Sequence, residues 1–246
     1  MKKTFLLALA LWGPTLAWAA TPTARQILER MDKNTFSQTQ VSISTMTVHG
    51  ERGDRNMTVQ TWTQGKDRSF SLYLAPARDK GTKMLKLGDK LWIYYPSADK
   101  VVAIAGHMLK NSMMGSDLSY EDLMENSSLV EAYEAQLVGE ETLLDRKVWV
   151  LELTAKEPER AYQKRKLWVD QQQYLALRQE LFAQSGMLLK RIEVKEVMAT
   201  AKGWYPKRVL FKDVLKTGLG TQWQIEELEL DPPIPASRFN KSSLGR

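Results

Sequence analysis

A long succession of strand-like runs separated by short turns limits how this 246-residue chain can fold. In several runs, such as 70–74, 188–197 and 222–230, apolar side chains alternate with polar or charged ones. Turn-like pairs such as Gly88-Asp89 and Ser185-Gly186 separate neighbouring runs. Connections this short join antiparallel strands, because parallel strands need long crossovers. The pattern therefore predicts an antiparallel sheet with one apolar face on each strand.

The number of runs predicts how the sheet bends. We count about 11–12 strands, and a sheet of that size curls, because large flat sheets are unfavourable. Two helices accompany it. One begins with Thr21 as N-cap and Pro22 in the first turn, and a short one spans 120–125, where Ser119 and Asp122 form a capping box. So few helices cannot fill a curved sheet. We therefore expect an α+β, mostly β fold: a half-open antiparallel β-barrel with an N-terminal helix and a short lid helix over an apolar cavity.

The first residues have the pattern of a secretory leader. Lys2 and Lys3 precede an apolar run, residues 5–12, and Ala17-Trp18-Ala19 supplies the small residues that a signal peptidase recognises. We expect cleavage after Ala19, a signal peptide over residues 1–19, and one domain over residues 20–246 in the periplasm. The chain has no cysteine, so neither a disulfide nor an acylated cysteine at the cleavage point is possible.

Enzyme signals are weak, and we expect neither catalysis nor a cofactor. His49 and His107 are the two histidines, and both lie in loop-like contexts. A zinc site built from them and carboxylates is an alternative, but loop histidines are more often solvated. Asp117, Glu121 and Asp122 could form an acid/base pair, but carboxylates at a helix start usually cap it. The net charge of +6 is spread along the chain without a nucleic-acid recognition motif, so no nucleic-acid partner is expected.

The apolar residues offer a better candidate site. The segment 106–128 interrupts the strand rhythm and carries Met108, Met113 and Met114; clustered methionines form adaptable apolar surfaces. We predict that this segment covers the sheet, with lid residues Met113, Met114, Leu118 and Tyr120. A one-residue register error would move every strand side chain to the other face. Choosing the more consistently apolar alternation gives a predicted cavity lining of Phe70, Leu72, Leu74, Trp92, Tyr94, Ile192, Val194, Val209, Phe211, Trp223 and Ile225.

Several segments carry a family resemblance. They are residues 91–96 (LWIYYP), 115–123 (GSDLSYEDL), 165–170 (RKLWVD) and 203–206 (GWYP). In this order the chain resembles the outer-membrane lipoprotein-sorting protein family, a subgroup of the LolA-like superfamily often associated with RND-type exporters. The 115–123 block is the most specific part of the match. The arginine-based release latch of the compact lipoprotein chaperone has no match in this sequence.

The resemblance implies a function as well as a fold. Such half-open barrels carry acyl chains of lipoproteins or lipids through the periplasm, and relatives sense lipid-linked ligands. The leading hypothesis is a periplasmic carrier of lipid or lipoprotein acyl chains between membranes, with an inner-membrane RND-type exporter and an outer-membrane acceptor as candidate partners. The alternative is a lipid-sensing or adaptor module of such an exporter, without net transport.

Overall fold

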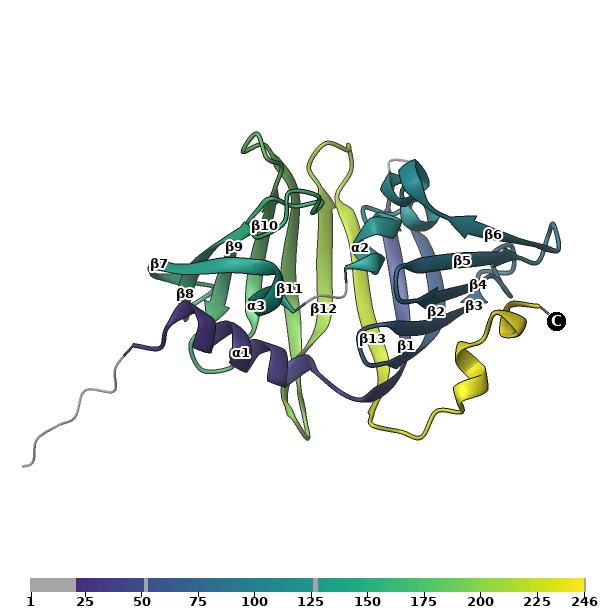
Figure 1. The fold of residues 1–246 in the computed structure, drawn as a ribbon, viewed down its shortest axis with the longest axis horizontal. Coiled ribbons are helices and arrows are strands. Elements are labelled where there is room, and N and C mark those ends of the chain that lie inside the picture. The colour runs from purple at the N-terminus through teal and green to yellow at the C-terminus, as the bar shows by residue number, and fades with distance from the viewer. Residues whose placement is uncertain (1–20, 51–52, 126–127, 246) are drawn as a thin grey trace, which may run out of the picture.

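Thirteen strands form one continuous antiparallel sheet (Figure 1). The computed structural model describes residues 21–50, 53–125 and 128–245, so the predicted leader lies outside the described residues. The strands are β1 Thr39–His49, β2 Arg55–Gln64, β3 Arg68–Ala75, β4 Lys83–Leu87, β5 Lys90–Tyr95, β6 Lys100–Ile104, β7 Tyr133–Leu143, β8 Arg146–Ala155, β9 Lys164–Asp170, β10 Ala176–Phe182, β11 Leu188–Thr200, β12 Gly203–Asp213 and β13 Gly220–Leu230.

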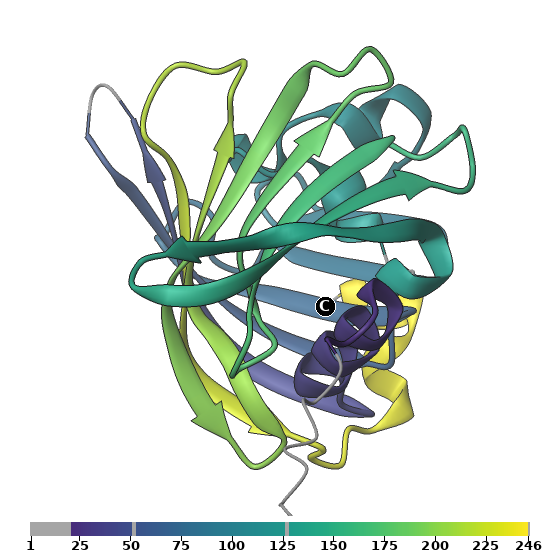
Figure 2. The ribbon, with the colours of Figure 1, turned by 90° about the vertical axis from the view of Figure 1, so that its left-hand side faces the viewer.

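The strand order gives the sheet two edges and therefore an open form. It runs β6-β5-β4-β3-β2-β1-β13-β12-β11-β10-β9-β8-β7, so the first and last strands of the chain, β1 and β13, meet in the middle. The sheet curves around α1 without closing (Figure 2). The predicted half-open, mostly β barrel is confirmed. The sheet has thirteen strands, slightly more than the 11–12 expected.

The N-terminal helix, α1 (Ala24–Thr35), packs on one half of the sheet. Thr23 is its N-cap, and it exchanges hydrogen bonds with Gln26 in a capping box. The predicted start at Thr21 is therefore wrong by two residues, because Thr23 has the reciprocal partner three positions later. One helix stripe, Ala24, Ile27 and Leu28, is buried in a core with side chains of β7, β8, β9 and β10.

The segment between β6 and β7 contains only short helical turns: η1 (Gly106–Lys110), η2 (Met113–Gly115), α2 (Tyr120–Met124) and α3 (Leu129–Ala132). Ser119 and Asp122 form the expected capping box at the start of α2. Strand β7 begins directly after α3, at Tyr133. The α2 helix and both 3-10 turns pack on the half-sheet β1–β6, away from α1.

The C-terminal segment covers the opposite face of the same half-sheet. Its turns η3 (Ala236–Phe239) and η4 (Lys241–Leu244) bury Phe239 and Leu244 against Phe70 and Leu85. Strands β3, β4 and β5 are therefore covered on both faces. Across the described ranges, the chain contains no helix with the length and apolar character needed to cross a membrane.

Candidate functional site

The inner face of the sheet, which carries α1 and the α2 segment, holds six of the predicted lining residues side by side. The strand register places Ile192 opposite Phe211, Val194 opposite Val209, and Val209 opposite Trp223. The row continues to β1, where Met46 faces Trp223 and Ser44 faces Ile225. The six residues on this face are Ile192, Val194, Val209, Phe211, Trp223 and Ile225. They form a continuous apolar strip across β11, β12 and β13 in the middle of the sheet.

The other five predicted lining residues are not part of this strip. Phe70, Leu72, Trp92 and Tyr94 pack with Phe239 and Leu244 on the outer face, under the C-terminal segment. Leu74 lies where the β2–β3 register breaks, between the partners of Thr58 and Val59. The inner face of β3 and β5 is formed instead by alternate residues such as Tyr73 and Ile93. The predicted common lining therefore does not hold for β3 and β5.

The predicted lid residues gather on the inner face of β1–β6. Met113, Leu118 and Tyr120 are buried there against Met46, Met57, Val59, Tyr73, Met84, Leu91, Ile93 and Ile104, and Met108, Met114 and Met124 pack against them. We call this group the lid cluster and residues 106–125 the lid segment. Seven of the chain's eleven methionines lie in the lid cluster. Because methionine is unbranched and polarizable, this interface can repack at low cost.

Two buried ion pairs fasten the lid segment to the other half of the sheet. Asp122 pairs with Lys190 on β11, and Glu125 pairs with Arg165 on β9. The Tyr162 hydroxyl also donates to Asp122 Oδ1 at 2.5 Å. We call these five residues the latch. The lid segment thus packs on β1–β6 through apolar contacts and is held to β9 and β11 through charges.

Burial and charge together set the protonation states in the latch. Burial opposes ionisation of Asp122, but the Lys190 ammonium and the Tyr162 hydroxyl outweigh it, so the pKa of Asp122 is lowered. Burial and the adjacent Asp122 carboxylate raise the pKa of Tyr162, which stays a neutral donor. Burial disfavours the Arg165 charge, but the Glu125 carboxylate overcomes this and raises the pKa of Arg165. Asp122 and Arg165 are therefore held in their charged forms by their partners.

A second attachment joins the lid segment to β12 and β13. Thr221 Oγ1 accepts a hydrogen bond from the Asp117 backbone N at 2.9 Å and donates to Asp117 Oδ2 at 2.8 Å. The Asp213 backbone N donates to Asp117 Oδ1 at 3.0 Å. Lys216 Nζ donates to Ser112 Oγ at 2.6 Å and to the Ser116 carbonyl at 2.7 Å. These contacts hold residues 112–117 on the ends of the central strands.

The polar residues considered for catalysis or metal binding have structural contacts instead. Asp117 and Asp122 bind the partners described above, and Glu121 stands in the first turn of α2. His49 pairs with Asp54 at 2.9 Å, and His107 lies exposed in η1. Within residues 21–50, 53–125 and 128–245, no three His, Cys, Asp or Glu residues gather into a group that could hold a metal ion.

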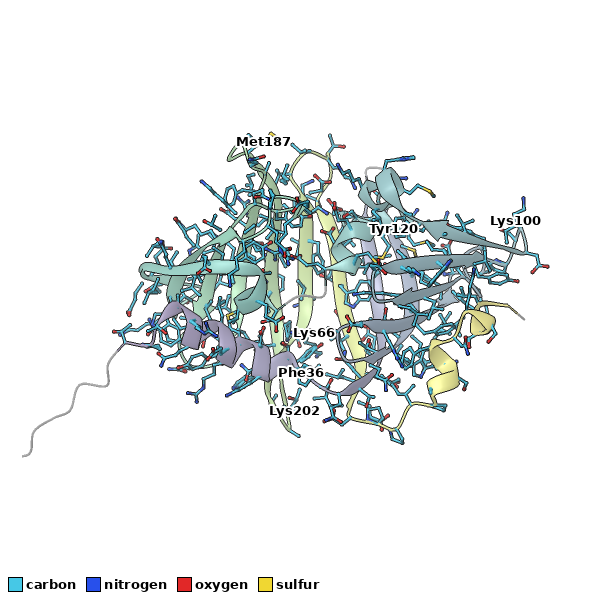
Figure 3. All side chains as sticks on the ribbon, in the orientation of Figure 1. Phe36, Lys66, Lys100, Tyr120, Met187 and Lys202 are labelled. Atoms are coloured by element: carbon cyan, nitrogen blue, oxygen red, sulfur yellow. The ribbon has the colours of Figure 1, made fainter. Side chains whose placement is uncertain are left out.

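A cavity of about 970 Å³ opens between α1, α3 and the ends of β1 and β2. Figure 3 shows Phe36, Lys66 and Lys202 around this opening between the two halves of the molecule. Its lining is mainly polar and charged, with Arg25, Lys33 and Glu131 beside the apolar Phe36 and Val130. None of the predicted lining residues borders this mouth. On the half-sheet β1–β6, the side chains of the lid cluster occupy the inner face.

Comparison with known proteins identifies the fold. A family model described as "Uncharacterized protein" matches residues 65–246. A DUF1329 family protein from Desulfovibrio piger is similar in structure, with 25% identity, a TM-score of 0.83, and 90% of this chain and 97% of that chain covered. A LolA superfamily protein from Nitrosomonas europaea shows 26% identity and a TM-score of 0.74, covering 91% of this chain and 100% of that one. The chain belongs to the family of the model that matches residues 65–246, and this family lies within the LolA-like superfamily.

Further comparisons agree with this assignment. An outer membrane lipoprotein-sorting protein domain from Vibrio parahaemolyticus shares the LolA-like fold at 22% identity and a TM-score of 0.79, covering 91% of this chain and 98% of that chain. None of the curated proteins matches the sequence significantly. The chain therefore shares the LolA-like fold of these proteins.

The latch residues of this LolA-like chain were not among the predicted site residues, although a signal for them exists. Arg165 has the same alternation as Leu167 and Val169, and Lys190 has that of Ile192 and Val194. A charge at an apolar position of a strand indicates a buried partner, because an unpaired buried charge is very costly. Both positions could therefore have been marked as sites of buried ion pairs.

Proposed function

We propose that this protein is a periplasmic carrier that shelters the acyl chains of a lipoprotein or lipid on its inner face. The observation that carries the proposal is the lid cluster, in which seven methionines form the contact between a short, mostly non-repetitive segment and the sheet. An interface of this kind can release the lid side chains and accept hydrocarbon of a different shape. The apolar strip on β11, β12 and β13 extends the same surface toward the middle of the sheet.

The energetics favour an exchange of lid side chains for cargo. Exposing an acyl chain to water costs about 0.8 kcal/mol per CH₂ group, so lipid crosses an aqueous compartment only when it is covered. The closed lid covers the apolar inner face in the same way while no cargo is bound. Acyl chains that take the place of the lid side chains keep that face dry, and the lid segment then moves outward.

The latch gives this exchange a defined barrier. Asp122 and Glu125 belong to the lid segment, whereas Lys190 belongs to β11 at the edge of the apolar strip and Arg165 belongs to β9 beyond it. Opening the lid breaks both ion pairs and hydrates four charges. Cargo must therefore contribute enough apolar contact to offset this loss, and the lid remains closed in its absence.

The leader predicted over residues 1–19 supports a location in the periplasm, and the scaffold needs no catalytic group for this task. The exporter-associated adaptor or sensor role differs from the carrier role in one measurable respect, which is net transfer of cargo. An RND-type exporter and an outer-membrane acceptor are the partners that the carrier role calls for.

Two measurements test the proposal. Native mass spectrometry of protein purified from the periplasm should show acyl-chain cargo bound in a 1:1 ratio, and labelled cargo should move to acceptor vesicles. Bound lipid that is never transferred would favour the sensor role, and protein without lipid that also takes up none would refute both roles.

A substitution in the lid cluster tests the assignment of the lid. M108A combined with M114A should change the rate of lipid uptake while the circular dichroism of the strands stays the same. M31A is the matched control, because Met31 is partly buried in the separate core under α1. Uptake rates that are equal in both variants would reject the lid assignment.

A further inference from the structure

Three large apolar side chains protrude from two turns at one end of the sheet. Met187, in the β10–β11 turn, is 50% exposed, and Leu215 and Leu219, in the β12–β13 turn, are 64% and 77% exposed. The turns are neighbours, since the Val214 backbone N donates to the Leu189 carbonyl at 3.0 Å. Both turns project from the same end of the molecule in Figures 1 and 2. One end of the sheet therefore exposes three large apolar side chains on two adjacent turns.

The β12–β13 turn is held in a fixed shape with its leucines outward. Asp213 Oδ1 accepts a hydrogen bond from the Leu215 backbone N at 3.1 Å. Lys216 points inward, where its Nζ binds Ser112 and Ser116 of the lid segment. The turn therefore presents Leu215 and Leu219 to the outside without further ordering. A preformed presentation of this kind lowers the entropic cost of binding.

The segments that form and border these turns carry a net positive charge in their own sequence. The three segments that meet at this end, 106–112, 183–190 and 212–220, contain four lysines and a single carboxylate, Asp213. The lysines are Lys110, Lys190, Lys212 and Lys216. Of these, Lys110 is exposed beside the turns. Basic residues beside protruding apolar side chains complement an anionic lipid surface.

A cavity lies directly behind the turns. It measures about 530 Å³, and its lining includes Leu215 of the turn together with Leu118, Leu189, Lys110 and Lys190. The lid segment thus borders this cavity on one side, and the apolar turn borders it on the other. A membrane in contact with the turns would lie next to the lid.

We propose that this end of the molecule docks on an anionic lipid bilayer. Met187, Leu215 and Leu219 enter the boundary between headgroups and acyl chains, and the exposed Lys110 faces the headgroup phosphates. The inference goes beyond cargo binding, because docking on a bilayer requires no lipid on the inner face. It also gives the lid a defined orientation, since the turn that contacts the bilayer is bonded to Ser112 and Ser116.

Protein-free vesicles of phosphatidylglycerol and phosphatidylethanolamine provide the test. The mature protein should co-float with these vesicles, and the variant M187S/L215S/L219S should bind about tenfold more weakly or worse, given the loss of three inserted apolar side chains. The matched control is V138S/L144S. Val138 lies on β7 and is 49% exposed, and Leu144 lies in the β7–β8 turn, at the opposite end of the strands, and is 70% exposed. The vesicle binding of this control should equal that of the unmodified protein.

A labelled variant gives a second readout that does not depend on the stability of the triple variant. Because the chain has no cysteine, L219C and L144C each take one environment-sensitive fluorophore. The label at residue 219 should shift to the blue on vesicles, and the label at residue 144 should not.

Several results would overturn the inference. The first is absence of binding to protein-free vesicles, which would assign the turns to a protein partner. The second is unchanged vesicle binding of the triple variant, and the third is an equal fluorescence shift of both labels. Uptake of a soluble fluorescent fatty acid is measured in parallel. Retained uptake with lost docking separates this inference from the proposed carrier function, because the two then fail independently.

Discussion

Replacing Lys190 with methionine should release the lid. Lys190 and Asp122 have side chains only 12% and 11% exposed, so removal of the ammonium leaves a carboxylate buried without its cation. Breaking a buried pair from one side costs about 3–5 kcal/mol. The lower end of this range applies here, because Tyr162 and Ser119 still donate hydrogen bonds to Asp122. Methionine keeps most of the aliphatic volume, so the packing around residue 190 changes little.

This cost should appear as lid opening and not as global unfolding. An open lid returns Asp122 to water, which removes the penalty, so K190M favours the open lid by as much as about 3 kcal/mol. At about 1.4 kcal/mol per factor of ten, the open population rises roughly 100-fold. Hydrogen exchange followed by mass spectrometry should therefore show faster exchange in residues 106–125, with strands β7–β9 unchanged.

Two further variants complete the experiment. K195M is the matched control, because Lys195 lies on the same strand and forms an exposed pair with Glu193, which contributes at most about 1 kcal/mol. D122N combined with K190M removes both charges and should recover most of the lost protection. If K190M leaves lid exchange as slow as K195M does, the ion pair does not hold the lid and the reasoning fails.

Three further perturbations have defined outcomes. The lowered pKa of Asp122 means that the latch keeps its full stabilisation above the unfolded value of 3.8 and loses it as the pH falls through the lower folded value; lid exchange, corrected for its intrinsic rate, should stay constant from about pH 8 to pH 5. S119A removes the N-cap of α2, and urea titration should show a loss of about 1 kcal/mol. G220A should lower the melting temperature, because Gly220 has φ +101° and an added Cβ would lie 2.5 Å from the Phe211 carbonyl oxygen.

Much of the fold could be predicted because each strand carries its own signal. In β11, β12 and β13 the alternation assigns the apolar residues to one face, and the strand register places them side by side. The capping box at Ser119 likewise placed α2, since both of its partners are close in sequence. These features depend on residues near one another along the chain.

Strands β3 and β5 show where this reasoning stops. Both of their faces are covered, one by the lid cluster and the other by Phe239 and Leu244 from the C-terminus. In β5, which is buried on both sides, the central positions Trp92, Ile93 and Tyr94 are all apolar, so alternation cannot assign its faces. In β3, the alternation of Phe70 and Leu72 with Ser71 marks the face that the C-terminal segment covers. The segment that covers both strands, residues 236–244, lies far along the chain, and no local sequence pattern in β3 or β5 predicts this contact.

The latch was missed for a related reason. Asp122 meets Lys190, and Glu125 meets Arg165, across 68 and 40 positions of sequence. Charged residues on strands are normally assigned to the solvent-exposed face. Lys190 and Arg165 depart from this rule, because their alternation with apolar neighbours places them on the inner face. In the proposed mechanism, these two charged residues, which stand among apolar residues of their strands, set the barrier to opening of the lid.

Locking the lid should separate its motion from the rest of the protein. Asp117 and Thr221 lie in direct contact, with Asp117 N 2.9 Å from Thr221 Oγ1, so we choose these positions for an engineered disulfide. D117C combined with T221C would place the only two cysteines of the chain at this contact. If lipid reaches the inner face by displacing the lid segment, the oxidised variant takes up none, and a reductant restores uptake in the same sample. Rapid uptake by the oxidised form would mean that acyl chains enter elsewhere, with the mouth beside Phe36 and Lys66 as the remaining route.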